Sequence, residues 1–185
     1  MTALRNEGKA GRETPNRPNC GGDAPPILPI PEQGHAVQAA LLALNNANAR
    51  ETSFLAAEDW RALVAGSFAA TCTTGATALL IAFDQDARYD SVNFKWFQAR
   101  RRRFVYVDRI VVSERHRERS LATCLYRDLF ERAKEAGHDR IACEVNLEPP
   151  NPRSDAFHAK MGFVTVGRAD LHPSGRTVRY WEKLL

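Results

Sequence analysis

The sequence is short of cysteine and methionine, and its cysteines are scattered. The 185 residues include four cysteines and two methionines. No two cysteines form a C-x-x-C pair, which argues against a zinc site and against a disulfide framework. The sequence therefore predicts no bound metal and four reduced thiols, as in a cytoplasmic protein. These thiols are Cys20, Cys72, Cys124 and Cys143.

Long apolar runs are also missing. The longest run, Ala76–Phe83, is far shorter than the roughly 20 residues that a membrane-spanning helix needs. The first residues contain no apolar core of the kind that a signal peptide has. We therefore expect a cytoplasmic protein without a membrane partner.

Charge of either sign is not in large excess. Lys and Arg number 26 against 22 Asp and Glu, for a net charge of +4. This mild basic balance suits a nucleic acid or an anionic small molecule equally well. Arg100–Arg103 is a run of four arginines, which is either a solvated turn or a contact for an acidic substrate or an RNA. No RNA- or DNA-binding motif is present, so nucleic acid is not the expected partner.

Proline and glycine are concentrated at the N-terminus. The first 34 residues hold six of the ten prolines and five of the eleven glycines. Such a polar segment buries too little surface to offset its ordering entropy. We expect a disordered tail over residues 1–30 and a folded domain over residues 31–185. Within Pro25–Pro31, apolar residues alternate with prolines, so this segment is expected to lie extended on the folded domain.

Apolar periodicity divides the first half of the domain into helices and strands. Helices are predicted over Val37–Leu44 and from Ala56 or Ala57 to Ala70. Strands are predicted over Ala76–Phe83 and Arg103–Val112, with polar, turn-rich sequence between them over Asp84–Asn93.

The second half alternates more regularly. A charged loop over Ser113–Arg119 precedes an amphipathic helix, Ser120–Ala136, which Gly137 ends. The later elements are a strand at Arg140–Asn146, a short helix capped by Ser154 or Asp155 and running to Met161, and strands at Phe163–Gly167 and Thr177–Leu184. This order predicts an α/β (α+β) fold, a central mixed twisted sheet flanked by helices.

One strand, loop and helix together predict an anion site. The strand ends at Val112, and the next helix begins near Ser120. Unpaired N–H groups and the helix dipole make a helix start attractive to phosphate. Arg115, Arg117 and Arg119 add full positive charges, so the site suits a diphosphate.

The run from Asp108 to Tyr126 resembles the acetyl-CoA signature of the GNAT acetyltransferase superfamily. That signature is a strand, then Arg/Gln-x-x-Gly-x-Gly/Ala, then a helix. Arg117 matches its first position and Ala122 its last. Asn151, seven residues before His158 and eleven before Gly162-Phe163, matches the family's pattern at the last helix. The resemblance covers roughly residues 35–185 and is strongest from Phe104 to Gly167.

The resemblance implies that acetyl-CoA binds in a V-shaped gap between two central parallel strands. The backbone of Ile110–Val112 would hydrogen-bond the pantetheine arm, and Asn151 would contact that arm or cap the last helix. Ser120 and Glu118 stand where the family commonly has glycine. The implied cofactor-binding residues are Ile110, Val111, Val112, Arg117, Glu118, Arg119, Ser120, Leu121, Ala122, Asn151 and His158.

The implied chemistry is direct attack of an amine on the thioester, which needs a base for the ammonium and an acid for the thiolate. His158 stands where the family often has a tyrosine acid, and Tyr126 is the alternative acid. Glu144 and Asp108 are the candidate bases, acting directly or through water. The structural alternatives are a salt bridge for Glu144 and an ion pair of Asp108 with Arg109.

The acceptor site is expected in the first half of the domain, where the resemblance is weakest. Tyr89, Asn93 and Phe94, in a polar and aromatic run, are its candidate residues together with Glu144. The expected acceptor is a primary amine of a small molecule, with a protein lysine or N-terminus as the alternative. A homodimer is compatible with the resemblance. The rival functions are a non-catalytic CoA-binding sensor or scaffold and, less favoured, a nucleic-acid-binding module.

Overall fold

A computed structural model describes residues 25–117, 119–171 and 175–185, and within them one seven-stranded sheet has the order β1-β2-β3-β4-β5-β7-β6. The pair β4–β5 is parallel and the other neighbours are antiparallel. The strands are β1 (Ile27–Pro29), β2 (Ala69–Thr73), β3 (Ala78–Asp84), β4 (Val105–Val112), β5 (Arg140–Glu148), β6 (Val164–Leu171) and β7 (Arg176–Leu184). This is the mixed sheet that the sequence predicts.

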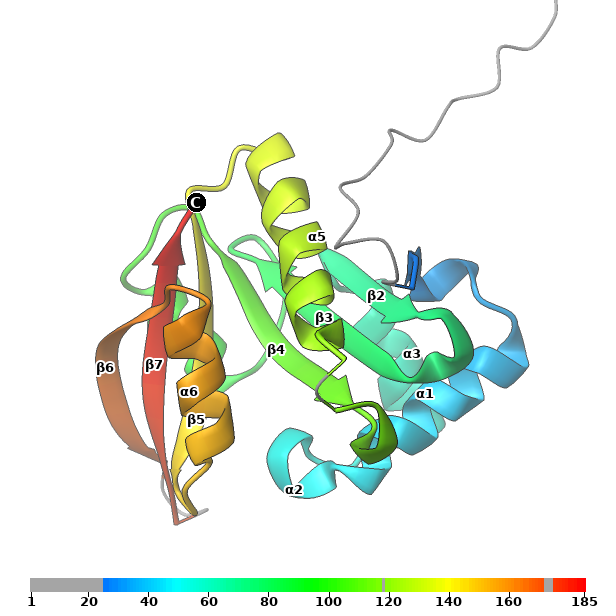
Figure 1. Cartoon of the computed structure of the whole chain (residues 1–185). Helices are drawn as coiled ribbons and strands as arrows, with labels where there is room; N and C mark the ends of the chain where they lie inside the picture. Colours follow the sequence, from blue (N-terminus) through cyan, green and yellow to red (C-terminus); the bar gives the residue numbers. More distant parts are fainter. Residues whose placement is uncertain (1–24, 118, 172–174) are drawn as a thin grey trace, which may run out of the picture.

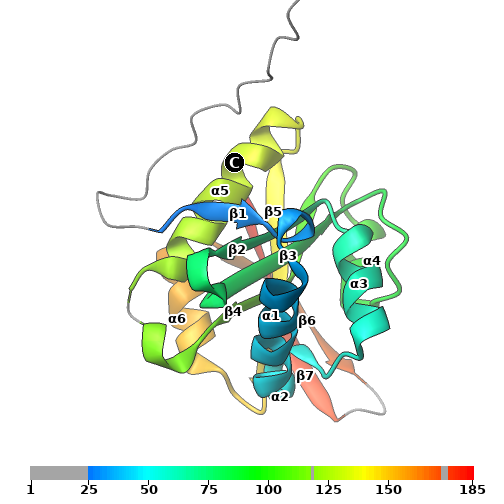
Figure 2. The same ribbon diagram turned by 90° about the vertical axis from the view of Figure 1, so that its right-hand side faces the viewer.

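Helices cover both faces of the sheet, as Figure 2 shows with α5 and α6 on one side and α1, α3 and α4 on the other. The helices are α1 (His35–Ala47), α2 (Ala49–Thr52), α3 (Ala57–Ala65), α4 (Val92–Gln98), α5 (Leu121–Glu135) and α6 (Pro152–Lys160), with 3-10 turns η1 (Ile30–Glu32), η2 (Thr74–Ala76) and η3 (Glu114–His116). Each face therefore has a hydrophobic core of its own.

The folded domain includes residues before Pro31, where the sequence places its start. Ile27, Leu28 and Pro29 pair with β2 as an edge strand, a position that tolerates proline. Ile30 is completely buried. The expected extended segment thus becomes β1, while residues 1–24 of the expected tail lie outside the described residues.

The helix predicted to reach Ala70 is wrong beyond Ala65. Gly66 follows the last helical residue, and Ala69–Thr73 forms β2 instead. Every residue of β2 is buried, so this strand has none of the alternation that marks a half-exposed strand. The alanines of β2 continue the helical pattern of α3 in the sequence, and the helix stop signal lies before them at Gly66-Ser67.

The sequence pattern does not predict α4. Turn-rich sequence is predicted up to Asn93, and a polar and aromatic run without a helix follows it, whereas the structure has a helix there. The Ser91 side chain caps this helix by accepting a hydrogen bond from Phe94 N. Phe94 and Phe97 are completely buried beneath it. The cap predicted for α6 is wrong as well, because Asn151, rather than Ser154 or Asp155, caps that helix.

The parallel strands β4 and β5 separate along their length. Their pairing covers Val105–Val107 against Ile141–Cys143 and stops there, although β4 continues to Val112 and β5 to Glu148. Ile81 pairs with Arg109 and Ala82 with Val107, so Asp108 forms a bulge. A bulge bends its strand, which turns β4 away from β5. Figure 1 shows the two strands diverging toward α2.

Candidate active site

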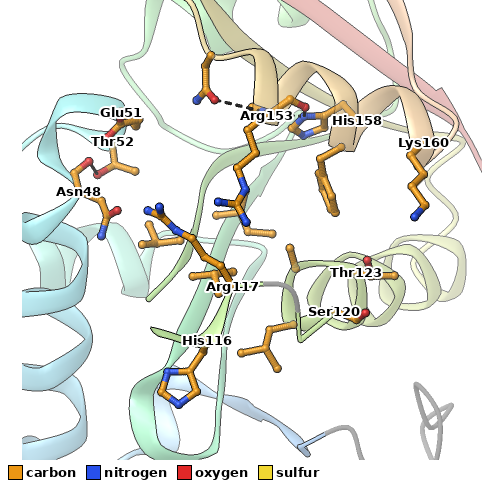
Figure 3. A pocket seen from close by; sticks show the side chains of 18 residues that line it. Asn48, Glu51, Thr52, His116, Arg117, Ser120, Thr123, Arg153, His158 and Lys160 are labelled. Carbon is orange, nitrogen blue, oxygen red and sulfur yellow. Dashed lines mark hydrogen bonds between the residues drawn. The ribbon is translucent and has the colours of Figure 1, made fainter. Parts of the chain in front are cut away.

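A cavity of about 570 Å³ lies over the separated ends of β4 and β5. Its walls come from α2, β4, the start of α5 and the inward side of α6, which Figure 3 shows from close by. The wall residues that the sequence predicts for cofactor binding are Ile110, Val111, Val112, Arg117, Ser120, Leu121, Ala122, Asn151 and His158. Arg119 is not part of this wall, and Glu118 lies outside the described residues.

The first turn of α5 presents its backbone to this cavity. The N–H groups at the start of a helix have no partner within the helix, so Leu121, Ala122 and Thr123 can donate to an anion. Ser120, the residue before the helix, has φ 56° and ψ 13° and is therefore left-handed. Glycine adopts this conformation without strain, which explains why the family favours glycine at this position.

Positive side chains surround this helix start. Arg117 and Arg153 point into the cavity from opposite sides, and Lys160 adds a third cationic side chain to its wall. Arg117 lies 3.7 Å from Glu114, with the Arg117 side chain 38 % exposed and that of Glu114 88 % exposed. A solvated pair of this kind is weak, so Arg117 remains available to a phosphate. Residues from two helices therefore fit an anionic ligand.

Asn151 positions α6 against the same cavity. Its side-chain oxygen accepts a hydrogen bond of 3.2 Å from Ser154 N, and Pro152 occupies the first helical position, where proline needs no N–H partner. Asn151 also contributes to the walls of both cavities. Capping, one of its two predicted roles, is confirmed, and contact with the cofactor stays a prediction.

A second cavity, of about 100 Å³, continues the first into the opening between β4 and β5. The two share six wall residues: Glu51, Thr52, Ile110, Asn151, Ser154 and His158. Successive residues of a strand point to opposite faces, so Cys143 faces α5 while Glu144 faces α4. The small cavity therefore connects the two faces of the sheet.

Glu144 is held by hydrogen bonds from two elements. The Tyr106 hydroxyl donates to Oε2 at 2.5 Å, and Asn93 Nδ2 donates to Oε1 at 2.9 Å. The Tyr180 hydroxyl in turn donates to Asn93 Oδ1 at 3.0 Å, which fixes the orientation of the amide. Burial raises the pKa of Glu144 to about 7, and the nearby Asp108 charge adds to the rise. Glu144 can therefore gain or lose a proton near neutral pH.

Asp108 is committed to neighbouring side chains. Its Oδ2 accepts a hydrogen bond of 2.6 Å from Arg109 Nε, and its Oδ1 accepts one from the Tyr89 hydroxyl. Arg109 is itself buried and donates to Asn45 Oδ1 at 2.9 Å. The ion pair that the sequence offers as the alternative for Asp108 is therefore present, which makes Glu144 the better candidate base.

His158 and Tyr126 meet on the other face of the gap. His158 is 3 % exposed, and its Nε2 lies 2.8 Å from the Tyr126 hydroxyl oxygen. Its Nδ1 lies 2.8 Å from the carbonyl oxygen of Ser154. Burial lowers the pKa of His158, which favours the neutral form of the ring. The candidate acids thus lie together, opposite the candidate base.

The predicted acceptor residues take supporting positions. Tyr89 binds Asp108, Asn93 binds Glu144, and Phe94 is completely buried. Among the described residues that form the two cavity walls, none of these three appears. Glu144 is the one predicted substrate residue that reaches a cavity. The aromatic run therefore supplies hydrogen bonds to Asp108 and Glu144 and does not itself line a cavity among the described residues.

Sequence reasoning missed several wall residues. They are Asn48, Glu51, Thr52, His116, Thr123, Arg153, Ser154, Phe157 and Lys160 in the larger cavity. Arg153 and Lys160 flank the recognised Asn151 and His158 positions, so their charge on a helix beside a phosphate site was a usable signal. Asn48, Glu51 and Thr52 carried no comparable signal, because only the tertiary fold brings α2 to the gap.

Three of the four consecutive arginines have structural partners. Arg101 forms a 2.6 Å ion pair with Glu182, and the Arg100 guanidinium lies 4.3 Å above the centre of the Trp96 ring. Arg103 approaches the carbonyl oxygen of Ala136 at 3.5 Å. These contacts secure the strand ends, so the run need not be explained by a substrate or an RNA.

Comparisons with known proteins agree with this architecture. NAA60 of Arabidopsis thaliana in complex with acetyl-CoA is 14% identical, with a TM-score of 0.63 and coverage of 86% of this chain and 98% of that one. A ribosomal-protein-alanine N-acetyltransferase from Brucella melitensis is 15% identical (TM-score 0.62, coverage 86% and 99%). An agmatine N-acetyltransferase mutant without ligand is 14% identical (TM-score 0.64, coverage 88% and 100%). At these identities, the likeness establishes the fold.

A search of curated protein sequences finds no significant match. Family membership rests on a sequence profile described as the acetyltransferase (GNAT) family, which matches residues 42–163 and so spans well over half of the chain. The matched region contains β4, the start of α5 and most of both cavity walls. The chain therefore belongs to the GNAT family of acetyltransferases, the family that its sequence resembles.

Proposed function

We propose that this protein transfers an acetyl group from acetyl-CoA to the primary amine of a small molecule, within a ternary complex. The observation that carries the proposal is the connected pair of cavities through the opening of the sheet. One end is cationic and meets a helix start, and the other contains a carboxylate with a pKa of about 7. An anionic donor and an amine can therefore meet between β4 and β5.

The chain has a suitable place for each part of acetyl-CoA. Arg117, Arg153 and the first N–H groups of α5 would hold the diphosphate. The edge of β4 over Ile110–Val112, unpaired toward β5, would hold the pantetheine arm by extending the sheet. When bound, acetyl-CoA supplies an activated thioester. The residues of the gap then have to orient the amine and move protons.

Glu144 would receive a proton from the attacking amine. An amine is nucleophilic only when deprotonated, and a base with a pKa near the working pH combines a free lone pair with useful basicity. Glu51 lies on the wall that both cavities share and adds a carboxylate to that of Glu144, while Asp108 on the wall of the small cavity is paired with Arg109. This negative end favours a cationic acceptor over an anionic one.

The small size of the acceptor end supports a small amine. Its volume of about 100 Å³ is below the range of roughly 300–1,000 Å³ typical of pockets for drug-sized ligands. A linear alkylamine would fill it, with the rest of the molecule outside. A peptide N-terminus places more bulk beside the amine and is the main alternative.

The test combines calorimetric titration with CoA and acetyl-CoA and a thiol-release assay. The assay would compare a panel of alkylamines and polyamines with a panel of short peptides at equal concentration. We expect micromolar CoA binding and acetylation of a small amine. Acetylation of peptides alone would contradict the small-molecule acceptor. Tight CoA binding with no acetyl transfer to either panel would instead support the sensor or scaffold function.

A further inference from the structure

Arg109 is a buried cation to which the proposed acetyl transfer gives no role. It is 5 % exposed and belongs to the wall of the smaller cavity. Its Nε donates to Asp108 Oδ2 at 2.6 Å, and its Nη1 donates to Asn45 Oδ1 at 2.9 Å. A buried guanidinium is costly unless it is paired and hydrogen-bonded. Arg109 meets this requirement through two elements, and so ties the bulge of β4 to the last turn of α1.

Asn45, which is completely buried, extends this link to the end of α2. Its Nδ2 donates to the carbonyl oxygen of Ser53 at 3.2 Å, while its Oδ1 accepts from Arg109. An amide side chain has its donor on one arm and its acceptor on the other. The bond from Arg109 therefore fixes which arm faces Ser53. If the amide turned over, two oxygens would face each other.

The end of α2 needs contacts of this kind. Ser53 has φ 72° and ψ 149°, close to a region that is essentially restricted to glycine. Another residue keeps such a conformation only where its surroundings impose it. Helix α2 itself has four residues, too few for a helix that is stable on its own. The place of α2 therefore depends on its contacts with α1, and the Asn45 bond to Ser53 is one of them.

The segment held in this way lines the candidate site. Glu51 and Thr52 form part of the walls of both cavities. Figure 3 shows them on the opposite side of the larger cavity from Lys160 and Thr123. A displacement of α2 would therefore act on the acceptor end and leave the phosphate end, at the start of α5, in place.

We propose that Arg109 is a positioning residue for acceptor binding, which holds α2 at the gap through Asn45. The inference rests on the proposed acetyl transfer, because it assigns the amine to the cavity that α2 borders. Arg109 also pairs with Asp108, so Glu144 and Glu51 are the carboxylates that meet a cationic amine. Arg109 takes part in no bond-making step. Its effect therefore falls on the KM for the amine more than on turnover.

The first test compares steady-state kinetics of Arg109 variants. Arg109→Met removes both hydrogen bonds, and Arg109→Lys keeps the charge without the planar fork that serves two partners. We expect the KM for the amine to rise about tenfold or more in Arg109→Met and by less in Arg109→Lys, with CoA affinity within about threefold of wild type. Arg101→Met is the matched control, because it removes a 2.6 Å ion pair of the same sheet, with Glu182, outside both cavity walls. Its amine KM should match wild type.

Variants of Asn45 separate positioning from charge neutralisation. Asn45→Leu removes both bonds of the amide, whereas Asn45→Asp keeps an oxygen for Arg109 and loses the donor to Ser53. Both variants leave the pair of Arg109 with Asp108 in place. We expect both to raise the KM for the amine about as much as Arg109→Met does. The double variant Arg109→Met/Asn45→Leu should have a KM no higher than the poorer single variant.

The second test needs no acceptor. In the wild type, the N–H groups of Thr52 and Ser53 donate to the carbonyl oxygens of Asn48 and Ala49 at 3.2 and 2.9 Å. A loosened α2 exposes these groups to water, so their amide hydrogen exchange should be about tenfold faster in Arg109→Met. Asn45→Leu should show the same increase, and Arg101→Met should show none.

The outcomes decide between the possible roles of Arg109. Wild-type amine KM and wild-type exchange at α2 in Arg109→Met and Asn45→Leu would overturn the proposal. A raised KM in Arg109→Met with wild-type kinetics in both Asn45 variants would also overturn it, because Arg109 would then only neutralise Asp108. If Arg109→Met does not fold, the Asn45 variants carry the same test. Faster exchange at α2 without acetylation of any amine by the wild type would support the hold on α2 and contradict the proposed function instead.

Discussion

At the scale of single residues, Glu144 and Ser120 each adopt a state that most residues of their type avoid. Glu144 is a half-buried carboxylate whose pKa is raised to about 7. Ser120 has the backbone conformation of a glycine. Glu144 lines the smaller cavity and Ser120 the larger, and perturbed acids and strained backbones tend to gather at such sites. Each therefore offers a substitution with a defined effect.

Substituting Glu144 by Gln removes the candidate base and nearly preserves its shape. A base acts only when deprotonated, so wild-type turnover should rise with pH through about 7 and then level off. Glu144→Gln should lose this rising limb and turn over about 10²–10⁴ times more slowly. The measurement is turnover across the pH range at saturating acetyl-CoA and amine. An unaltered pH profile would point to Asp108 or to water.

Substituting Ser120 by Gly relieves a left-handed residue beside the anion site. A side chain in this conformation costs roughly 1–2 kcal/mol, while glycine loses about 0.5–1 kcal/mol more entropy on folding. We expect slightly higher stability and CoA binding several-fold tighter in Ser120→Gly. Calorimetry and denaturant unfolding measure the two effects. Ser120→Val, which adds branching at the same φ, should be less stable than wild type.

At the scale of elements, the cofactor end is made where two helices begin. α5 begins after Ser120 and α6 after Asn151, and both starts contribute to the larger cavity. Arg117 precedes the first helix and Arg153 lies in the first turn of the second. The positive ends of both helix dipoles and both guanidinium groups therefore act on the same ligand.

Removing either guanidinium should weaken CoA binding. A hydrogen bond to a charged group contributes about 1.5–3 kcal/mol, so Arg117→Ala and Arg153→Ala should each lower CoA affinity about tenfold or more. The loss should shrink as salt is added. Arg115→Ala is the matched control, because Arg115 is exposed in the same loop and does not belong to the cavity wall. Equal affinities for all three variants would contradict the phosphate assignment.

At the scale of the whole molecule, a packing path joins the far edge of the sheet to the acceptor end. Gly167 of β6 leaves room for the Trp96 ring, and a Cβ at Gly167 would lie 2.7 Å from Trp96 Cζ2. The Trp96 ring stacks on Tyr180 with ring centres 4.2 Å apart. Tyr180 orients Asn93, and Asn93 binds Glu144. A change on β6 can therefore reach the candidate base.

Gly167→Ala should displace Trp96 and loosen this path. Overpacking of this kind costs about 1–3 kcal/mol of stability. Because the hydrogen bond from Asn93 favours the charged carboxylate, its loss should shift the rising limb of the pH–rate profile above the wild-type position. Thermal unfolding and the pH profile measure the two effects. Gly34→Ala is the control, since a Cβ there meets nothing within 4 Å, and its pH profile should match wild type.

Local patterns were enough to predict the centre of the fold. The alternation along β4, the apolar stripe of α5 and Gly137 with its φ of 77° are local signals, and the structure confirms each of them. The spacing of Arg117 and Ala122 likewise identified residues that line the larger cavity. The sequence pattern does not predict β2, because burial on both faces removes the alternation of apolar and polar residues.

The acceptor end depends on contacts between distant parts of the chain. Asn93 and Glu144 are 51 residues apart, and Tyr180 is 87 residues from Asn93. Contacts between residues so far apart cannot be predicted from the pattern of a single sequence. Tyr126 could be placed on the apolar stripe of its helix, but its contact with His158 depends on how α5 and α6 pack. Sequence patterns therefore predicted the wall of the larger cavity better than the hydrogen bonds around Glu144 and His158.

The short pairing between β4 and β5 has a mechanical consequence. Among the described residues, three pairs, Val105–Val107 with Ile141–Cys143, join one half of the sheet to the other. Because so few pairs cross this seam, we expect the sheet to open there first, and a ligand held by both α5 and α6 would oppose that opening. Ligand binding should therefore slow amide hydrogen exchange at the seam itself, beyond the residues that contact the ligand.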